Sequence, residues 1–555
     1  MWRGGEKTWA DITKEKEKTL LTNSGLSSNE KQPQIICPFC HQVVVGHLGE
    51  HIKKVHGDKY FKQAVLEAKK SGISDEEIGK RFGISYRQLE QIITENYGAN
   101  VSTLNPSKKV RAWAPKNFKE ETTTVWSFKS RGNWATHNGR YRGNWSPYIP
   151  RNLILKYTEP GEVVLDYFVG GGTTAIEAKL LGRRCIARDI NPAAIALTKE
   201  SLKFTLPNNL FNHIYEPEVS VGDARDLGDI ATGTIDLICA HPPYAGIISY
   251  SSEVEGDLSK LSVDDFLKEM KKVAWESLRV LKPGGKCAIL IGDARKKKHV
   301  IPIGFQTIRV FLNAGFTLRE LVIKRQHNCK TTGFWYKRSI QYNFLLLAHE
   351  YLPIFEKPKV NCIAERRTFW EYKLPYRRII KKAELIEQGK LETTTVWIFP
   401  RKQLDSEIKR NLLNRFGRKE CEFIEIEFNK DRPKLQAEIK ESPSLIYVSP
   451  PNNLDDINAA FGYRKTIQEI AEQASEFLLP NDFFVVDTKD VRINGVLQPM
   501  ALLLWDDLSR NNKFSIKEVV IVVPENLSEE NSFESSSEYL HIVHRYLLIF
   551  RKREV

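Results

Sequence analysis

From Val163 onward, short apolar runs alternate with segments of helical period, and this alternation limits the fold more than any other feature of the sequence. Two helical segments, at 173–181 and 193–204, each follow an apolar run, at 163–168 and 183–190. Further apolar runs lie at 236–240, 286–291 and 316–324, and the pair 342–349 and 350–355 is expected to form an antiparallel hairpin at the sheet edge. Such alternation predicts an α/β fold built on a parallel, doubly wound sheet.

The length of 555 residues predicts three to four domains. The longest apolar run, Met500 to Trp505, is expected to be a buried strand and is far shorter than the roughly 18 residues of a membrane-spanning helix. The first residues lack the apolar stretch of a secretory signal, so we expect a cytoplasmic, reducing location. Lys and Arg number 83 against 69 Asp and Glu, a net charge of +14 that favours a polyanionic partner.

Residues 1–33 are polar and are expected to form a flexible arm, and residues 34–57 contain a compact set of metal-ligand side chains. The spacing Cys37-x2-Cys40-x10-His51-x4-His56 predicts a zinc finger of the C2H2 type with one structural Zn²⁺. A segment this short cannot bury a core of its own, so the metal would supply its folding energy. The alternatives are a short helical hairpin with incidental histidines, and His47 as the ligand in place of His56.

Residues 58–100 contain two helix-start signals on either side of a glycine turn. Ser74 and Glu77 form one capping box, Ser85 and Gln88 form a second, and Gly83 lies between them. This pattern predicts a helix-turn-helix that contacts double-stranded DNA, although small helical hairpins also serve as protein docking units. The residues expected on the groove-facing helix are Tyr86, Arg87 and Gln91. Residues 101–119 are expected to be a linker.

A triple-glycine turn, Gly170 to Gly172, follows the apolar run that ends near Asp166. Glycines let the backbone approach a ligand closely, and the turn lacks the Lys before Ser or Thr that grips a triphosphate. A nucleotide-like ligand without a triphosphate is therefore favoured. Asp189 lies about 20 residues further on, where a carboxylate accepts from ribose hydroxyls. The alternative is a turn that only allows tight packing of strand on helix.

A second motif, His241-Pro242-Pro243-Tyr244, follows the apolar run at 236–240. Consecutive prolines stiffen a loop and leave its carbonyls free to accept from an amino group, while a tyrosine ring stacks on a planar base. A lone histidine is more often a satisfied core residue than a site residue. A histidine directly before Pro-Pro-Tyr at a strand end is not lone, so we assign it to the site.

Together, Asp166 to Thr174 and His241 to Tyr244 resemble the exocyclic-amino DNA methyltransferases, which act on cytosine N4 or adenine N6. That family carries Asp-Pro-Phe-x-Gly-Ser-Gly-Thr-Thr and (Asp/Asn/Ser)-Pro-Pro-Tyr. The resemblance covers residues 120–356 and includes an upstream segment, 131–154, that is similar to the family's cofactor-closing segment. It implies a catalytic domain with a Rossmann-like sheet that uses S-adenosylmethionine. The turn at Leu281 to Gly285 is also similar to the family's.

Carried over residue by residue, the resemblance implies two groups of site residues. Those expected to bind the cofactor are Asp166, Phe168, Gly170, Gly172, Thr173, Asp189 at the ribose and Asp223 at the adenine amino group. Those expected to hold a flipped base for methyl transfer are His241, Pro242, Pro243 and Tyr244. Two positions depart from the family: His241 replaces its Asp, Asn or Ser, and Tyr167 replaces its proline. The His241 change leaves cytosine N4 and adenine N6 both open.

The sequence also repeats itself. Glu392 to Trp397 matches Glu121 to Trp126, and further matches follow in the same order: Ser449-Pro-Pro-Asn452 with His241 to Tyr244, Asp490-Val-Arg492 with Asp293-Ala-Arg295, and 544–550 with 349–355. Trp126 precedes His241 by 115 positions, but Trp397 precedes Ser449 by only 52. We predict that residues 391–555 are a degenerate methyltransferase-like domain without glycine turn or ribose carboxylate. Such a domain would hold DNA, replace a dimer partner or act as a brace.

Three functions are consistent with these observations. The first is site-specific DNA methylation, with cytosine slightly favoured because Ser449 suggests an ancestor of the cytosine type. The second is methylation of RNA or tRNA bases, and the third is a DNA-binding regulator that has lost activity through the change at His241. The basic, aromatic linker at 357–390 would contact phosphates or lie on the surface. A restriction or defence-system partner and the oligomeric state are left open.

Overall fold

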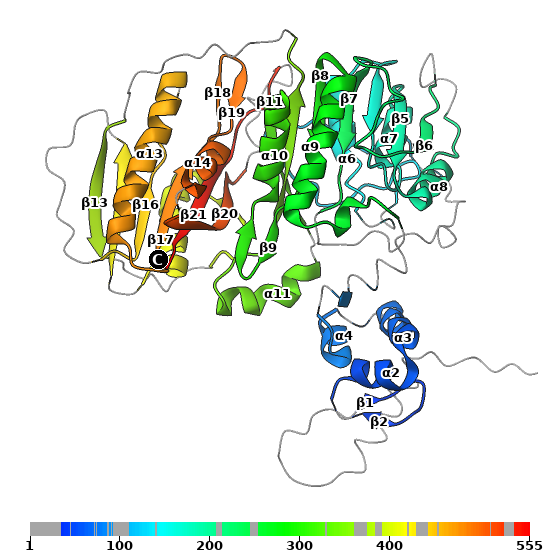
Figure 1. The fold of residues 1–555 in the computed structure, drawn as a ribbon, viewed down its shortest axis with the longest axis horizontal. Helices are drawn as coiled ribbons and strands as arrows, with labels where there is room; N and C mark the ends of the chain where they lie inside the picture. The colour runs from blue at the N-terminus through cyan, green and yellow to red at the C-terminus, as the bar shows by residue number, and fades with distance from the viewer. Residues whose placement is uncertain are drawn as a thin grey trace, which may run out of the picture. The chain divides into compact units, whose positions relative to one another are not determined.

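The computed structural model describes most of the chain between residues 35 and 554 (Figure 1). The positions outside the described residues are 1–34, 45, 72, 74, 86–87, 90–91, 93–109, 111, 139–140, 142, 207–213, 245–253, 328–329, 360–373, 383–390, 419–420, 429–441, 452–453, 455, 511, 527–537 and 555. The predicted arm at 1–33 lies among them. The chain divides into an N-terminal unit, residues 1–100 with 247–253, and a larger unit, residues 101–246 with 254–555.

The N-terminal unit is a small helical body with one short hairpin. Its elements are β1 (Ile35–Ile36), β2 (Val43–Val44), α2 (Leu48–His56), α3 (Asp58–Lys70) and α4 (Asp75–Phe82). Cys37, Ile52, Phe61 and Phe82 belong to one buried cluster, so the hairpin and the helices fold on a shared core. The predicted capping box at Ser85 is present, since Gln88 N–H donates to Ser85 Oγ and Ser85 N–H donates to Gln88 Oε1.

The first half of the larger unit is an eight-stranded sheet in the order β3-β11-β12-β8-β7-β4-β5-β6. Its strands are β3 (Val125–Trp126), β4 (Val163–Asp166), β5 (Arg184–Asp189), β6 (Glu218–Val221), β7 (Ile235–Ala240), β8 (Leu281–Ile289), β11 (Thr317–Arg325) and β12 (His349–Glu356). Its helices are α6 (Tyr148–Tyr157), α7 (Thr173–Leu180), α8 (Pro192–Ser201), α9 (Val263–Val280), α10 (Ile303–Ala314) and α11 (Lys330–Gln341). A hairpin of β9 (Ala294–Lys296) and β10 (His299–Ile301) follows β8. Helices cover both faces, as the alternation predicts.

The second half repeats this topology in shortened form (Figure 1). Its elements are β13 (Tyr376–Lys382), β14 (Val396–Phe399), α12 (Leu404–Phe416), β15 (Glu422–Phe428), β16 (Leu445–Val448), α13 (Ile457–Phe477), β17 (Phe483–Thr488), the hairpin β18 (Val491–Ile493) and β19 (Val496–Gln498), α14 (Met500–Ser509), β20 (Phe514–Pro524) and β21 (Arg545–Lys552). The order β14-β20-β21-β17-β16-β15 matches β3-β11-β12-β8-β7-β4. Only residues 429–444 join β15 to β16, whereas residues 167–234 join β4 to β7 and supply α7, β5, α8 and β6.

The expected linker at 357–390 contains the edge strand β13, which pairs with β15. Two sequence predictions about elements are wrong. The segment 342–349 is not the first strand of an edge hairpin, because β12 alone forms there and lies inside the sheet between β11 and β8. Leu346 lies against the second half, where it forms an isolated β-bridge with Thr394. This contact accounts for the apolar side chain at that position. The run Met500 to Trp505 is a helix, α14, and not a strand. A short apolar run carries no period that separates the two, and here it is buried at the junction of the halves.

The two halves meet through contacts that occur twice, once in each direction. His349 Nδ1 lies 2.9 Å from Thr395 Oγ1, and His544 Nδ1 lies 2.9 Å from Thr124 Oγ1. Figure 1 shows α10 and α14 side by side at this junction, where Phe305 contacts Trp505. Reciprocal contacts of this kind are the signature of a two-fold, isologous interface. One hydrophobic cluster runs through both halves, so the larger unit is stabilised as a single body.

Candidate active site

The glycine turn lies between β4 and α7, at the carboxyl end of the parallel strands. Gly170 and Gly172 have φ of +53° and +87°, a backbone region that favours glycine. Asp166 accepts from Phe168 N–H at 2.9 Å and from Thr174 Oγ1 at 2.5 Å, and its burial raises its pKa to about 7. This carboxyl group therefore holds the shape of the turn.

Asp189 lies beside the same turn, because β5 is parallel to β4 and ends at this residue. Its Oδ2 accepts from Gly170 N–H at 3.0 Å and its Oδ1 from Asn191 N–H at 2.9 Å. Burial raises the pKa of Asp189 to about 6. Since a carboxylate oxygen accepts more than one hydrogen bond, each oxygen retains capacity for a ligand hydroxyl.

Asp223 follows β6, the next strand along the edge, and is bound by an arginine. Arg225 Nε donates to both carboxylate oxygens, at 2.9 and 3.0 Å. Burial raises the pKa of Asp223, but the hydrogen bonds from Arg225 outweigh it, and the pKa lies below its ordinary value. Asp223 is thus ionised and fixed in position. Of the other predicted cofactor residues, Phe168 packs edge-on against Tyr167, and Thr173 is buried at the first turn of α7.

The His-Pro-Pro-Tyr loop begins where β7, the neighbour of β4, ends. His241 Nε2 lies 3.2 Å from the Tyr244 hydroxyl, which donates to Glu350 Oε1 at 2.5 Å. Lys324 Nζ donates to the other oxygen of Glu350 at 2.6 Å. Burial raises the pKa of Glu350, but Lys324 and the other partners lower it to about 2 overall. Pro242 is buried and Pro243 is partly buried between the two ends of this chain of contacts.

The direction of the hydrogen bond from Tyr244 to Glu350 indicates which nitrogen of His241 carries a proton. Burial lowers the pKa of His241 to about 4, although the charge of Glu350 acts to raise it, so the ring is neutral. The ionised Glu350 only accepts, so the Tyr244 proton points to it and the Tyr244 oxygen accepts from His241 Nε2–H. Nδ1 then holds a lone pair. This buried atom has no hydrogen-bond partner among the described residues.

Three residues, Tyr141, Asn144 and Trp145, connect the two motifs. Asn144 Oδ1 accepts from Gly171 N–H at 2.9 Å, and the Trp145 ring stacks on His241 with centroids 5.9 Å apart. A Cβ added to Gly170 would lie 2.8 Å from the Tyr141 ring. The glycine turn and the His241 loop therefore face one shared edge of the sheet.

Sequence reasoning missed several buried groups that hold this edge together. Glu177 of α7 accepts from Trp134 Nε1 at 2.6 Å, from His137 Nε2 at 2.7 Å and from Arg151 at 2.9 Å, which fastens the segment 131–154 to the sheet. A glutamate between Ile176 and Ala178 of this helix was the available signal, since a buried carboxylate needs partners. Glu350, between a histidine and an apolar run, gave the same signal.

The second half does not reproduce the His241 contacts. Arg545 occupies the position of Glu350 and forms a buried ion pair with Asp487, which also accepts from the Tyr447 hydroxyl at 2.7 Å. Ser449 Oγ lies 3.3 Å from Glu425 Oε1. Asn452 lies outside the described residues.

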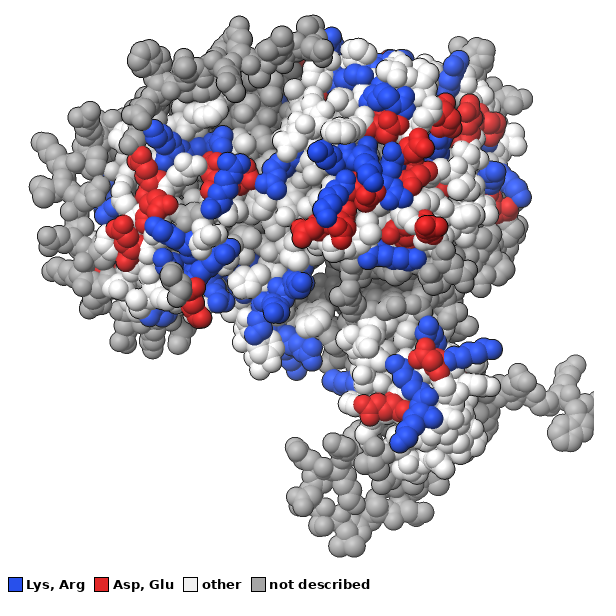
Figure 2. Space-filling view, viewed as in Figure 1, with Lys and Arg blue, Asp and Glu red and all other residues white. Residues whose placement is uncertain are grey.

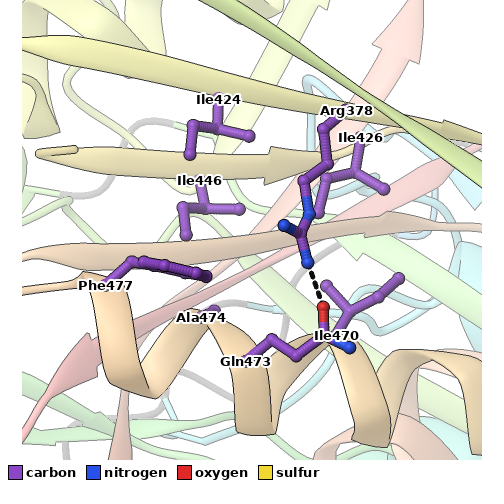
Figure 3. Close-up of a pocket in the computed structure, with 8 residues that line it drawn as sticks. All are labelled: Arg378, Ile424, Ile426, Ile446, Ile470, Gln473, Ala474 and Phe477. Atoms are coloured by element: carbon purple, nitrogen blue, oxygen red, sulfur yellow. Dashed lines mark hydrogen bonds between the residues drawn. The ribbon is translucent and has the colours of Figure 1, made fainter. Parts of the chain in front are cut away.

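A solvent-open hollow of about 230 Å³ lies in the second half between β13, β15, β16 and α13 (Figure 3). Isoleucines make up half of the residues that line it, and Arg378 reaches across it to hydrogen-bond with Gln473. None of the predicted site residues lines this hollow.

The N-terminal unit brings together the four predicted metal ligands. One ligand atom from each of Cys37, Cys40, His51 and His56 lies within 4.8 Å of the others. Cys37 Sγ is 3.5 Å from His56 Nε2, and Cys40 Sγ is 3.3 Å from His51 Nε2. Such spacings suit a tetrahedron with Zn–S near about 2.3 Å and Zn–N near about 2.0 Å. His47 lies outside this cluster, with Nδ1 3.1 Å from the Lys80 carbonyl.

The residues expected on the groove-facing helix, Tyr86, Arg87 and Gln91, lie outside the described residues. Among the described residues, none of the helices combines the length and the apolar character of a membrane span.

The chain is similar to known methyltransferases. A tRNA (guanine(10)-N2)-dimethyltransferase of Methanothermobacter thermautotrophicus is 34% identical over 128 residues, covering 23% of this chain and 34% of the relative. The type II methyltransferase M.MthZI of the same species is 28% identical over 175 residues, 27% of this chain and 49% of the relative, so this chain spans half or less of such relatives. A SAM-dependent methyltransferase structure from Methanosarcina mazei covers 37% of this chain and 97% of its own, at 16% identity and a TM-score of 0.26, too low to add to the assignment. The DNA methylase family matches residues 13–200 and 235–426, more than half of the sequence, and the chain belongs to that family.

Proposed function

We propose that this chain transfers a methyl group from S-adenosylmethionine to the exocyclic amino nitrogen of a base flipped out of duplex DNA, with cytosine N4 slightly favoured over adenine N6. The observation that carries the proposal is the buried His241 Nδ1 atom, which has no hydrogen-bond partner among the described residues and lies at the same edge as the glycine turn. In the family, an Asp, Asn or Ser oxygen stands at this position. A neutral imidazole nitrogen replaces that acceptor.

The residues of the glycine turn fit the cofactor. At Gly170 the backbone alone faces Tyr141, and any larger residue would also be strained by the positive φ. Asp189 would accept from the two ribose hydroxyls, and the ionised Asp223 would accept from the adenine amino group. The bound cofactor supplies a methyl group on a positively charged sulfur.

His241 would then position the reacting nitrogen. Nδ1 accepts one N–H of the target amino group, and the carbonyls before Pro242 and Pro243 are suited to accept the other. When both hydrogens of the amino group are held, the lone pair of its nitrogen points at the methyl group that is transferred. Orientation then takes the place of general-base catalysis. The proton leaves after the methyl group has been transferred.

The other members of the loop would hold the flipped base. Tyr244 is fixed through its hydroxyl by the ion pair of Glu350 and Lys324, so its ring has a set orientation for stacking. Because Glu350 binds Tyr244 through one carboxylate oxygen and Lys324 through the other, Glu350 and Lys324 act as positioning residues.

The remaining parts of the chain would serve DNA binding and support. We assign one structural Zn²⁺ to Cys37, Cys40, His51 and His56, and DNA contact to the helices at 58–100. Residues 391–555 would be a degenerate copy that replaces the partner subunit of a methyltransferase dimer. Its shortened β15–β16 connection and its Arg545–Asp487 ion pair support this assignment.

A second candidate is methylation of an RNA base, because one relative is named as a tRNA dimethyltransferase. Incubation of the full chain with labelled S-adenosylmethionine and either duplex DNA or structured RNA separates the two. Nucleoside analysis by mass spectrometry should show N4-methylcytosine or N6-methyladenine in DNA. Label in RNA alone would reject the DNA proposal, and tight DNA binding without transfer would indicate an inactive regulator.

A further inference from the structure

The turn between β9 and β10 has a conformation that its residues disfavour. Lys297 and Lys298 have φ of +47° and +67°. Two consecutive left-handed residues in a two-residue hairpin turn favour Asn-Gly, since a residue with a Cβ is strained there. Both lysines are exposed, so packing against a core does not explain the choice.

The second half contains the same turn with the favoured residues. In the β18–β19 hairpin the two positions are Asn494 and Gly495, with φ of +49° and +78°. The equivalence is set by matching arginines: Arg295 donates to the Lys298 carbonyl at 3.1 Å, and Arg492 donates to the Gly495 carbonyl at 3.3 Å. The fold itself therefore accepts Asn-Gly, and only the first half keeps strained lysines. Strain of this kind points to function.

The lysine turn lies at the same sheet edge as His241. β8 is parallel to β7, and the chain leaves β8 through Gly292, where an added Cβ would lie 3.1 Å from the Tyr244 ring. The β9–β10 hairpin follows directly. β11 is antiparallel to β12, which is antiparallel to β8, so α11 also begins at this edge.

The region around the β9–β10 turn carries mostly positive charge. Residues 294–349 contain eleven Lys and Arg but a single carboxylate, Glu320. Four of the eleven form ion pairs elsewhere: Arg295, Arg309, Arg319 and Lys324. Lys296, Lys297, Lys298 and Lys337 are exposed, and within the described residues none pairs with a carboxylate. Figure 2 shows blue side chains gathered where Figure 1 places β9 and α11, without red among them.

An aromatic side chain accompanies these lysines. Lys298 Nζ lies 4.2 Å from the centroid of the Tyr342 ring, just after α11, and 45% of Tyr342 is exposed. The ring holds the ammonium group at the surface without neutralising it, as a carboxylate would. A lysine held in this way remains available to an anion.

We propose that the Lys297–Lys298 turn, with Lys296 and Lys337, binds the phosphate backbone of duplex DNA next to the flipped base. The inference rests on the proposed function for the identity of the polyanion. It explains why the first half retains a strained turn that the second half has relaxed: only the first half has a site beside which DNA must be held.

The test replaces the turn by its relaxed counterpart, Lys297→Asn with Lys298→Gly, in the full chain. The melting temperature should rise, because the strain is removed, while affinity for a 30-base-pair duplex falls. Each phosphate contact contributes about 0.9 to the slope of log K against log salt concentration, so that slope should fall by about 2. Binding of S-adenosylmethionine, measured by calorimetry, should not change.

The control removes two exposed lysines of the second half, Lys402→Asn with Lys489→Asn, and should leave the salt slope within error of the unaltered protein. A rise in melting temperature with an unchanged salt slope for duplex DNA would overturn the proposal, as would a slope that falls only with structured RNA. The methyl-transfer assay on the unaltered chain keeps the two proposals apart. If the unaltered chain transfers no methyl group while the turn variant still shows a smaller slope of log K against log salt concentration for duplex DNA, the proposed function is rejected. The same result would support the proposed DNA-binding surface.

Discussion

Arg309 of α10 forms an ion pair with Asp506 of α14, and the two residues occupy equivalent positions in the two halves. The equivalence follows from Asp293 and Asp490, which accept from the N–H groups of Gly304 and Ala501 in the same way. Two copies of the first half would place Arg309 against Arg309, and two copies of the second would pair aspartates. This contact therefore favours the pairing of unlike halves over like ones.

Reversing one charge of this contact should weaken the junction. We expect Arg309→Asp to lower the free energy of unfolding by about 1 kcal/mol, a modest value because 42% of the Arg309 side chain is exposed. The double variant Arg309→Asp with Asp506→Arg should recover part of the loss. Recovery should be incomplete, since Asp506 also pairs with Arg510 at 2.6 Å. Denaturant unfolding of the three variants forms the double-mutant cycle, and additive losses would show that the pair is not coupled.

The sequence repeat predicted that two related halves exist, but not how they touch. Glu121 to Trp126 and Glu392 to Trp397 were matched by sequence alone, and the structure places each against the opposite half through Thr124 and Thr395. A local pattern shows which residues are apolar or paired within an element. It does not show which faces of the two halves meet. Leu346 and α14 are buried by contacts between the halves, so the local pattern could not predict their secondary structure.

The same limit separates the site residues that the sequence predicted from those that it did not. The glycine turn and the His241 loop were recognisable because their residues are contiguous in sequence. Glu177 and Glu350 were not, because their partners lie far away in the chain: Glu177 binds Trp134, 43 positions before it, and Glu350 binds Tyr244, 106 positions before it. A buried carboxylate in a sequence indicates that hydrogen-bond or ion-pair partners exist, but it does not identify them.

His349 should make the stability of the larger unit depend on pH. Burial lowers its pKa to about 4 in the folded protein, against an ordinary value near about 6.5. As the pH falls, the unfolded chain therefore binds this proton before the folded protein does. The contribution of neutral His349 to the free energy of unfolding, about 3 kcal/mol, is fully present above about pH 6.5 and is lost as the pH falls to about 4. In His349→Asn the contribution is absent. The stability difference between the two proteins should shrink over that pH window, and a constant difference would contradict the assignment.

Asp189 and Ser449 should differ sharply in their effect on cofactor binding. Asp189→Ala removes the proposed ribose acceptor and should weaken S-adenosylmethionine binding at least about tenfold, the value of one or two charged hydrogen bonds. Ser449→Ala alters the second half, which has no glycine turn, and should leave binding unchanged. Calorimetric titration measures both. Weakened binding in Ser449→Ala would show that the second half takes part in the cofactor site.

The metal cluster makes a stoichiometric prediction for the N-terminal unit. We expect one Zn²⁺ per chain by elemental analysis, and its loss in His56→Ala but not in His47→Ala, since His47 binds the Lys80 carbonyl instead. Metal loss should unfold the N-terminal unit while the melting of the larger unit, which has its own cores, stays unchanged. A metal-free chain with an intact N-terminal unit would refute the zinc assignment.

The role of His241 is tested by separating its shape from its lone pair. His241→Phe keeps a ring for Trp145 to stack on but removes the Nδ1 acceptor, and should lower kcat by about 100-fold or more, because the amino nitrogen is no longer oriented. His241→Asn restores an acceptor oxygen of the kind the family uses and should retain more activity than the phenylalanine variant. Since burial keeps the pKa of His241 near about 4, the histidine should not impose a loss of rate between pH 8 and pH 5.5. Equal rates in the phenylalanine variant and the unaltered protein would mean that the lone pair takes no part in transfer, whereas a drop in rate centred near pH 6.5 that disappears in His241→Asn would place His241 in contact with water.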